Sequence, residues 1–243
     1  GEFVTNTGTK KRRFRRVESK ITAKGARAIF YRQFLEYKKE KYFIFTKMTV
    51  LSAVVAFIFA YSLQKSVSDS SMAGFILLGV VAYVALIMSG YTGKWESELK
   101  NPYIFLIPDS PLKKMWYATL MEHVKAFADG CIICIPIGIF WHVPVIEIIY
   151  CILIYTVLQA DRLYTMVIVQ SLLGEVFGKT GQSLLRMFIQ MALLGVGAGV
   201  GVLAAVLISQ TLIFPIVLIY GLMITVAMGA IALLRFDTME QFV

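Results

Sequence analysis

Charged residues and histidines are scarce in this chain. Only 16% of its 243 residues are charged, against about 25% in an ordinary soluble domain. Its two histidines are too far apart to form a metal site, which needs clustered ligands. The sequence has no G-x-S-x-G or H-E-x-x-H motif. We therefore expect no catalysis by this chain and no metal or cofactor bound to it.

Cysteines are also few, and none is placed for redox chemistry. Cys131, Cys134 and Cys151 all lie in apolar segments. A thiol buried among apolar side chains is unreactive. The C-x-x-C spacing of the first two is therefore interpreted as small apolar packing, and the cysteines predict no disulfide framework.

Long hydrophobic segments dominate what remains. Hydrophobic residues make up 58% of the chain, and six apolar stretches lie at 42–64, 72–93, 115–142, 145–169, 184–208 and 212–234. A helix needs about 20 residues to cross a hydrocarbon core of about 30 Å. The pattern predicts an all-α, polytopic membrane protein with six transmembrane helices, which form one membrane domain over residues 42–236.

The positive charges are distributed unevenly. Thirteen of the 24 Lys and Arg residues precede position 42, and most of the others fall on the same side of the predicted spans. The positive-inside rule then places both termini in the cytoplasm, with 237–243 as a cytosolic tail. The net charge of +9 is concentrated just before a span, which favours contact with anionic lipids over nucleic acid. Residues 1–22 are interpreted as a basic, disordered linker or a cloning remnant.

Residues 23–41 predict an amphipathic helix. Ala26, Phe30, Phe34 and Tyr37 fall on one stripe at helical spacing. A basic, aromatic-faced helix before a span is typical of an elbow that lies along the inner membrane surface. The alternative is a cytosolic extension of the first span.

The connection 94–114 carries the most informative pattern. Pro102, Pro108 and Pro111 prevent a single helix there, and Ser110 before Pro111 predicts the start of a new helix. The apolar run Tyr103–Ile107 lies between the prolines. Such a run marks either a docking surface or packing under the bundle.

Two features inside the spans remain open. Gly195/Gly199 and Gly197/Gly201 form interleaved G-x-x-x-G pairs, which suit close helix packing within the bundle or at a subunit interface. Asp161 and Arg162 are charged residues within a span. They either pair within the bundle or take part in transport or gating.

Two stretches together resemble a known family. The elbow G-A-R-A-I-F-Y-R-Q-F-L-E-Y-K-K and the segment N-P-Y-I-F-L-I-P-D-S-P-L-K-K are similar to those of the bacterial "putative ABC exporter" family. The resemblance implies the permease half of an exporter in the plasma membrane, paired with a second six-span unit as the other half of one protein or as a homodimer. Separate ATPase subunits would bind ATP and magnesium. They would contact the coupling segment 94–114 and the elbow at Phe105, Leu106, Ile107, Pro108, Ser110, Phe30 and Phe34.

Other classes of membrane protein are also considered. An ATP-independent channel or secondary carrier would use charged residues at mid-membrane, for which Asp161 and Arg162 are the candidates. A membrane enzyme and an anchoring or immunity-type protein without transport are further alternatives. Uptake into proteoliposomes without ATP would indicate a carrier.

Overall fold

The computed structural model describes residues 23–39, 43, 45, 47–67, 70–90, 94–99, 102–173 and 178–241. The regular structure in these ranges is helical throughout. The predicted linker 1–22 and the last two residues of the predicted tail lie outside the described part of the chain.

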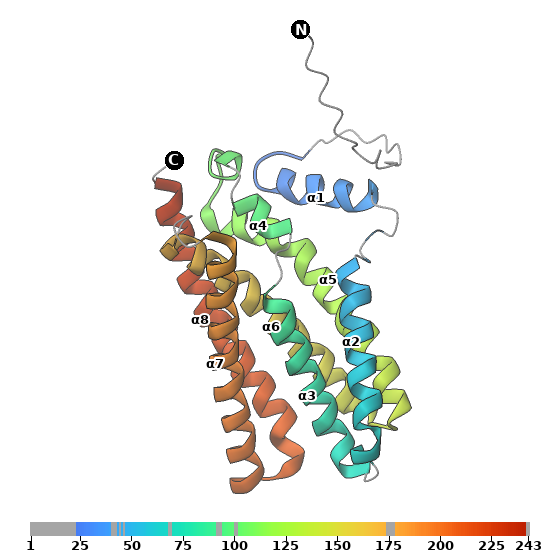
Figure 1. The fold of residues 1–243 in the computed structure, drawn as a ribbon. Helices are drawn as coiled ribbons and strands as arrows, with labels where there is room; N and C mark the ends of the chain where they lie inside the picture. Colours follow the sequence, from blue (N-terminus) through green and yellow to red (C-terminus); the bar gives the residue numbers. More distant parts are fainter. Residues whose placement is uncertain are drawn as a thin grey trace.

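Long helices form the body of the molecule and run side by side (Figure 1). They are α3 (Ser70–Ser89), α5 (Pro111–Phe140), α6 (Val145–Leu173), α7 (Gly178–Leu207) and α8 (Ile213–Gln241). Within the described residues, five helices are long and apolar enough to cross a membrane. They correspond to the second to sixth predicted spans. The all-helical, polytopic architecture is therefore confirmed, and α8 continues through residues 237–241 of the predicted tail.

The first predicted span is shorter in the structure. Helix α2 (Lys47–Leu63) has 17 residues, which corresponds to about 26 Å at 1.5 Å per residue. It is apolar but shorter than the five long helices, and the short helix η1 (Gln64–Val67) follows it. Residues 42, 44 and 46 lie outside the described ranges. A sixth span therefore stays a prediction.

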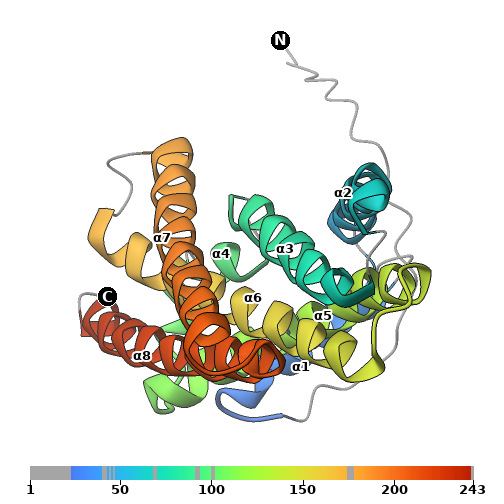
Figure 2. The same ribbon diagram turned by 90° about the horizontal axis from the view of Figure 1, so that it is seen from below.

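Helix α6 lies at the centre of the bundle, between α5 and α8 and next to α3 and α7 (Figure 2). Two clusters of buried side chains surround it. The first, deeper in the bundle, includes Leu77, Val81, Ile137 and Ile154. The second, at the end that carries α1, includes Trp95, Phe105, Leu163, Val167 and Phe236. The second cluster thus packs the segments at this end against α6 and α8.

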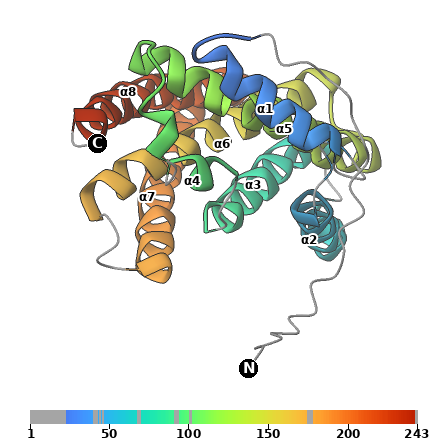
Figure 3. The same ribbon diagram turned by 90° about the horizontal axis from the view of Figure 1, so that it is seen from above.

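Helix α1 (Arg27–Lys39) lies across one end of the bundle, over α5, with α4 (Lys94–Leu99) beside it (Figure 3). Its buried residues are Ile29, Gln33 and Tyr37. Ala26 and Tyr37 of the predicted stripe are thus buried, but Ile29 and Gln33 take the inner positions predicted for Phe30 and Phe34. Phe30 and Phe34 are only half-buried, and their rings stack with centroids 6.2 Å apart. Gln33 can take the inner position because its amide donates to the carbonyl oxygen of Ala118 at 3.0 Å.

The glycines of α7 separate into two faces. A Cβ on Gly197 would lie 3.0 Å from the ring of Tyr220, and one on Gly201 would lie 3.3 Å from Val217. Both partners are on α8, so this pair allows α7 and α8 to approach closely. Gly195 and Gly199 have open space where a Cβ would be added, and both are exposed. The two pairs therefore have different surroundings.

Gly197→Leu should destabilise the bundle more than Gly195→Leu. Both changes replace a helical glycine by leucine. The loss of the glycine by itself stabilises the helix by about 1 kcal/mol. Only the side chain at position 197 must displace Tyr220, and such overpacking costs about 1–3 kcal/mol. Thermal unfolding of the detergent-solubilised monomer checks this. Equal melting temperatures for the two variants would contradict the assigned helix faces.

Candidate functional site

The proline-bounded loop, residues 102–110, is anchored on one side and exposed on the other. It contains the short helix η2 (Pro102–Ile104), and α5 begins at Pro111 as predicted. Ile104 and Phe105 are buried, whereas Tyr103, Leu106 and Pro108 are exposed. Each predicted alternative therefore applies to part of the apolar run. Ile104 and Phe105 pack against the bundle, and Tyr103 and Leu106 remain accessible to a partner.

The side chain of Phe105 anchors the loop to the bundle. Its side chain is 8% exposed, and its ring lies 5.1 Å from that of Phe236 on α8. The ammonium group of Lys114, which is fully buried, donates to the carbonyl oxygen of Phe105 at 3.1 Å. A buried cation is tolerated only when polar groups replace its water shell. The side chain of Phe105 thus faces inward, while Leu106 beside it is 65% exposed.

Trp95 of α4 anchors the beginning of the same connection. Its ring stacks 6.5 Å from that of Phe236, and its indole nitrogen donates to the carbonyl oxygen of Leu163 on α6 at 3.2 Å. A buried indole normally requires such a partner. The loop and α4 therefore share Phe236 as a common support.

Asp109 joins the loop to the beginning of α1. Its carboxylate accepts hydrogen bonds from the backbone N–H of Ala26 at 3.2 Å and of Ser110 at 2.9 Å. It also lies 3.4 Å from the ammonium group of Lys113. These contacts lower the pKa of Asp109, the bond from Ala26 most of all, because they favour the charged form. At Gly25 the backbone has a φ of 63°, and an added Cβ would lie 2.9 Å from the carboxylate.

Polar contacts hold α1 against α4 and α5. The guanidinium of Arg32 pairs with Glu98, and the ammonium of Lys94 lies 3.7 Å from the ring centroid of Tyr37. The hydroxyl of Tyr37 donates to Glu122 at 3.2 Å. Helix α1 and the loop therefore form one surface at this end of the bundle.

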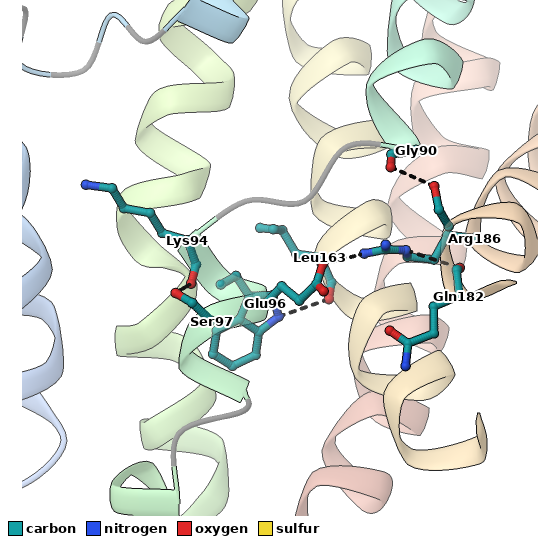
Figure 4. A network of polar contacts seen from close by, with 9 residues as sticks. Gly90, Lys94, Glu96, Ser97, Leu163, Gln182 and Arg186 are labelled. Carbon is teal, nitrogen blue, oxygen red and sulfur yellow. Dashed lines mark hydrogen bonds and ion pairs between the residues drawn. The ribbon is translucent and has the colours of Figure 1, made fainter. Parts of the chain in front are cut away.

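A buried ion pair joins α4 to α7 (Figure 4). Arg186 and Glu96 lie 3.2 Å apart, with side chains 3% and 9% exposed. Close by, the hydroxyl of Ser183 donates to the carbonyl oxygen of Gly90 at 2.7 Å. The connection after α3 is thus held to α7 as well as to α6 and α8.

Asp161 and Arg162 diverge, although they are neighbours on α6. The guanidinium of Arg162 donates to Gln159 at 2.9 Å and lines a cavity of about 30 Å³ with Glu122 and Asp129. Asp161 lines a different, larger cavity. They therefore do not form a pair with each other.

Several residues that build this site could not be identified from the sequence. Asp109, Lys114, Glu96 and Arg186 are ordinary surface types in a linear reading. The prolines located the loop, but no spacing rule relates Asp109 to Ala26, which is 83 positions away. Trp95 was the nearest available signal, because tryptophan side chains are highly buried on average.

Asp109→Ala should loosen the beginning of α1, because the backbone N–H of Ala26 loses its acceptor. Limited trypsin digestion checks this, with cleavage after Arg27 expected to be several-fold faster. Lys113→Gln is the matched control, since it removes the ion pair and leaves both backbone hydrogen bonds. Equal cleavage in Asp109→Ala and the unmodified protein would contradict the assigned role.

Arg186→Met should strongly destabilise the protein, by about 3–5 kcal/mol, because the buried Glu96 would lose the guanidinium of its ion pair. The double variant Glu96→Met/Arg186→Met should recover most of that loss. Thermal unfolding in detergent measures both. A double variant less stable than the single one would contradict the view that the buried Glu96 carboxylate, once deprived of the guanidinium, causes the damage.

A family model described as "putative ABC exporter" matches residues 1–240. The search of curated proteins and the search of solved structures produced no match. The matched range contains the long apolar helices, α1 and the proline-bounded loop. The chain therefore belongs to the putative ABC exporter family.

Proposed function

We propose that this chain is the permease component of an ATP-driven exporter in the plasma membrane of a bacterium. A separate ATPase subunit, which holds ATP and magnesium, would dock on the surface formed by the proline-bounded loop and α1. The family membership and the long apolar helices support a transport role. The basic residues predicted on one side favour a cytoplasmic position for this surface.

The observation that carries the proposal is the contrast between Leu106 and Phe105. Leu106 is 65% exposed, whereas Phe105 is 8% exposed and packs on Phe236. Fully burying a leucine side chain contributes about 1.5–3 kcal/mol. An exposed apolar side chain on a firmly anchored loop suits a partner that binds the loop and also transmits force to it. Leu106, Pro108 and Ser110 are thus proposed to contact the ATPase, and Ile107 to support them.

The anchors of the loop provide a route for mechanical coupling. Phe105 and Trp95 meet Phe236 on α8, Trp95 binds Leu163 on α6, and Glu96 pairs with Arg186 on α7. Packed elements move as rigid bodies, because their interfaces have few alternative arrangements. Closure of the ATPase subunits would then tilt α6, α7 and α8 together. This tilt would switch the translocation path from access on the inner side to access on the outer side.

The proposal also includes a second membrane unit of six spans. It would be the other half of a longer protein or a second copy of this chain. The exposed Gly195 and Gly199 leave α7 a face that another helix could approach closely. Phe30 and Phe34 lie on the half-buried side of α1 and are proposed to contact lipid or the ATPase.

Leu106→Asp should abolish co-purification of an ATPase subunit from native membranes, because a carboxylate cannot enter an apolar contact without a partner. Leu172→Asp is the matched control. Leu172 is also an exposed leucine, near the end of α6, but it lies outside the loop and α1.

Pull-down followed by mass spectrometry measures the bound ATPase, and membrane fractionation verifies that each variant inserts. Undiminished ATPase recovery with Leu106→Asp would contradict the assignment of this surface. Loss of the ATPase with both variants would mean that the effect is not specific to the loop.

A further inference from the structure

A large apolar cavity lies among α3, α6, α7 and α8. Its volume is about 330 Å³, which falls within the range of about 300–1,000 Å³ typical of small-molecule sites. Most of its lining is aliphatic or aromatic, with residues such as Phe75, Leu78, Ile154, Leu194 and Val217. Lipid contacts alone would not require any charged group in such a lining.

Asp161 is the one charged residue in the lining of this cavity. The residue is 1% exposed, and its Oδ1 atom has no hydrogen-bond partner among the described residues. At 1.5 Å per residue it lies about 24 Å from the beginning of α6 and about 18 Å from its end. A carboxylate buried in this way is costly without a compensating charge.

The surrounding residues do not supply that charge. Arg162 is directed to the separate cavity with Gln159, Glu122 and Asp129, and none of the ion pairs of the described residues includes Asp161. The hydroxyl of Tyr220, which also lines the cavity, donates to the carbonyl oxygen of Leu193 at 3.1 Å. The site therefore has an acceptor atom, Oδ1 of Asp161, that forms no hydrogen bond with the described residues. Its lining also offers a large apolar contact area.

The cavity is accessible from the side of the bundle. Gly79 on α3 and Ala198 and Val202 on α7 line it and are exposed, and α3 and α7 lie on either side of α6 (Figure 2). A Cβ added at Gly79 would have no neighbour within 4 Å. A molecule dissolved in the membrane could therefore enter between α3 and α7.

We propose that this cavity binds a lipophilic cation, an apolar or aromatic body with one ammonium group that pairs with Asp161. The cation would supply the missing charge, and the apolar lining would hold the body. This ligand class is the cargo only if the proposed transport function is correct, whereas binding itself requires no ATPase. A lipid acyl chain is the rival occupant, and it would make no use of the carboxylate.

Two matched probes test the proposal: a naphthylmethyl-trimethylammonium ion and its uncharged isostere, in which carbon replaces nitrogen. Equilibrium dialysis against the full chain in nanodiscs of zwitterionic lipid measures both. Asp161→Asn should weaken binding of the cation by about tenfold or more, which corresponds to about 1.4 kcal/mol, and should change binding of the isostere less than about twofold. Glu147→Gln is the matched control, because it removes a carboxylate from the same helix outside the cavity.

Gly79→Phe provides an independent variant, since its ring would occupy the opening and should weaken binding of both probes. Unchanged cation binding in Asp161→Asn would overturn the proposal. Equal losses for both probes in that variant would overturn it too, because they would indicate an apolar cavity suited to an acyl chain. Failure of the ATPase assignment is distinguishable, since Leu106→Asp should leave cation binding intact.

Discussion

The end of the molecule that carries α1 depends on how the bundle supports a segment that cannot be helical. Prolines deprive the loop of backbone donors, so side chains must satisfy and anchor it. The buried ammonium group of Lys114 binds the carbonyl oxygen of Phe105, and Phe236 receives the rings of both Phe105 and Trp95. With this support the loop keeps Leu106 exposed, together with Tyr103 and Pro108.

Helix α6 separates two environments that a transporter would keep apart. Consecutive residues on a helix point about 100° away from each other, so Asp161 lines the apolar cavity while Arg162 lies among Gln159, Glu122 and Asp129. In the proposed mechanism, movement of α4 would reach α6 through the hydrogen bond from Trp95 to the carbonyl oxygen of Leu163. The proposed docking surface and the proposed cation site are thus connected through one buried helix.

Helix α1 shows why a stripe of aromatic residues is an incomplete guide to the face that packs. Gln33 lies inside because Ala118 offers an acceptor, and Phe30 and Phe34 remain half-buried. In a membrane protein an apolar side chain has two suitable surroundings, protein and lipid, whereas a polar one must find a partner. Polar residues therefore decide the orientation of such a helix.

The sequence alone predicted the approximate positions of the five long apolar helices, the break at the prolines and the helix beginning at Pro111. These features depend on local composition and on the backbone restrictions of individual residues. Only the tertiary structure decided that Phe105 packs inward and Leu106 outward, that Gly197 meets α8 while Gly195 does not, and that Asp161 and Arg162 face different cavities. Transmembrane helices are apolar on all sides, so hydrophobic periodicity cannot distinguish the face that meets protein from the face that meets lipid.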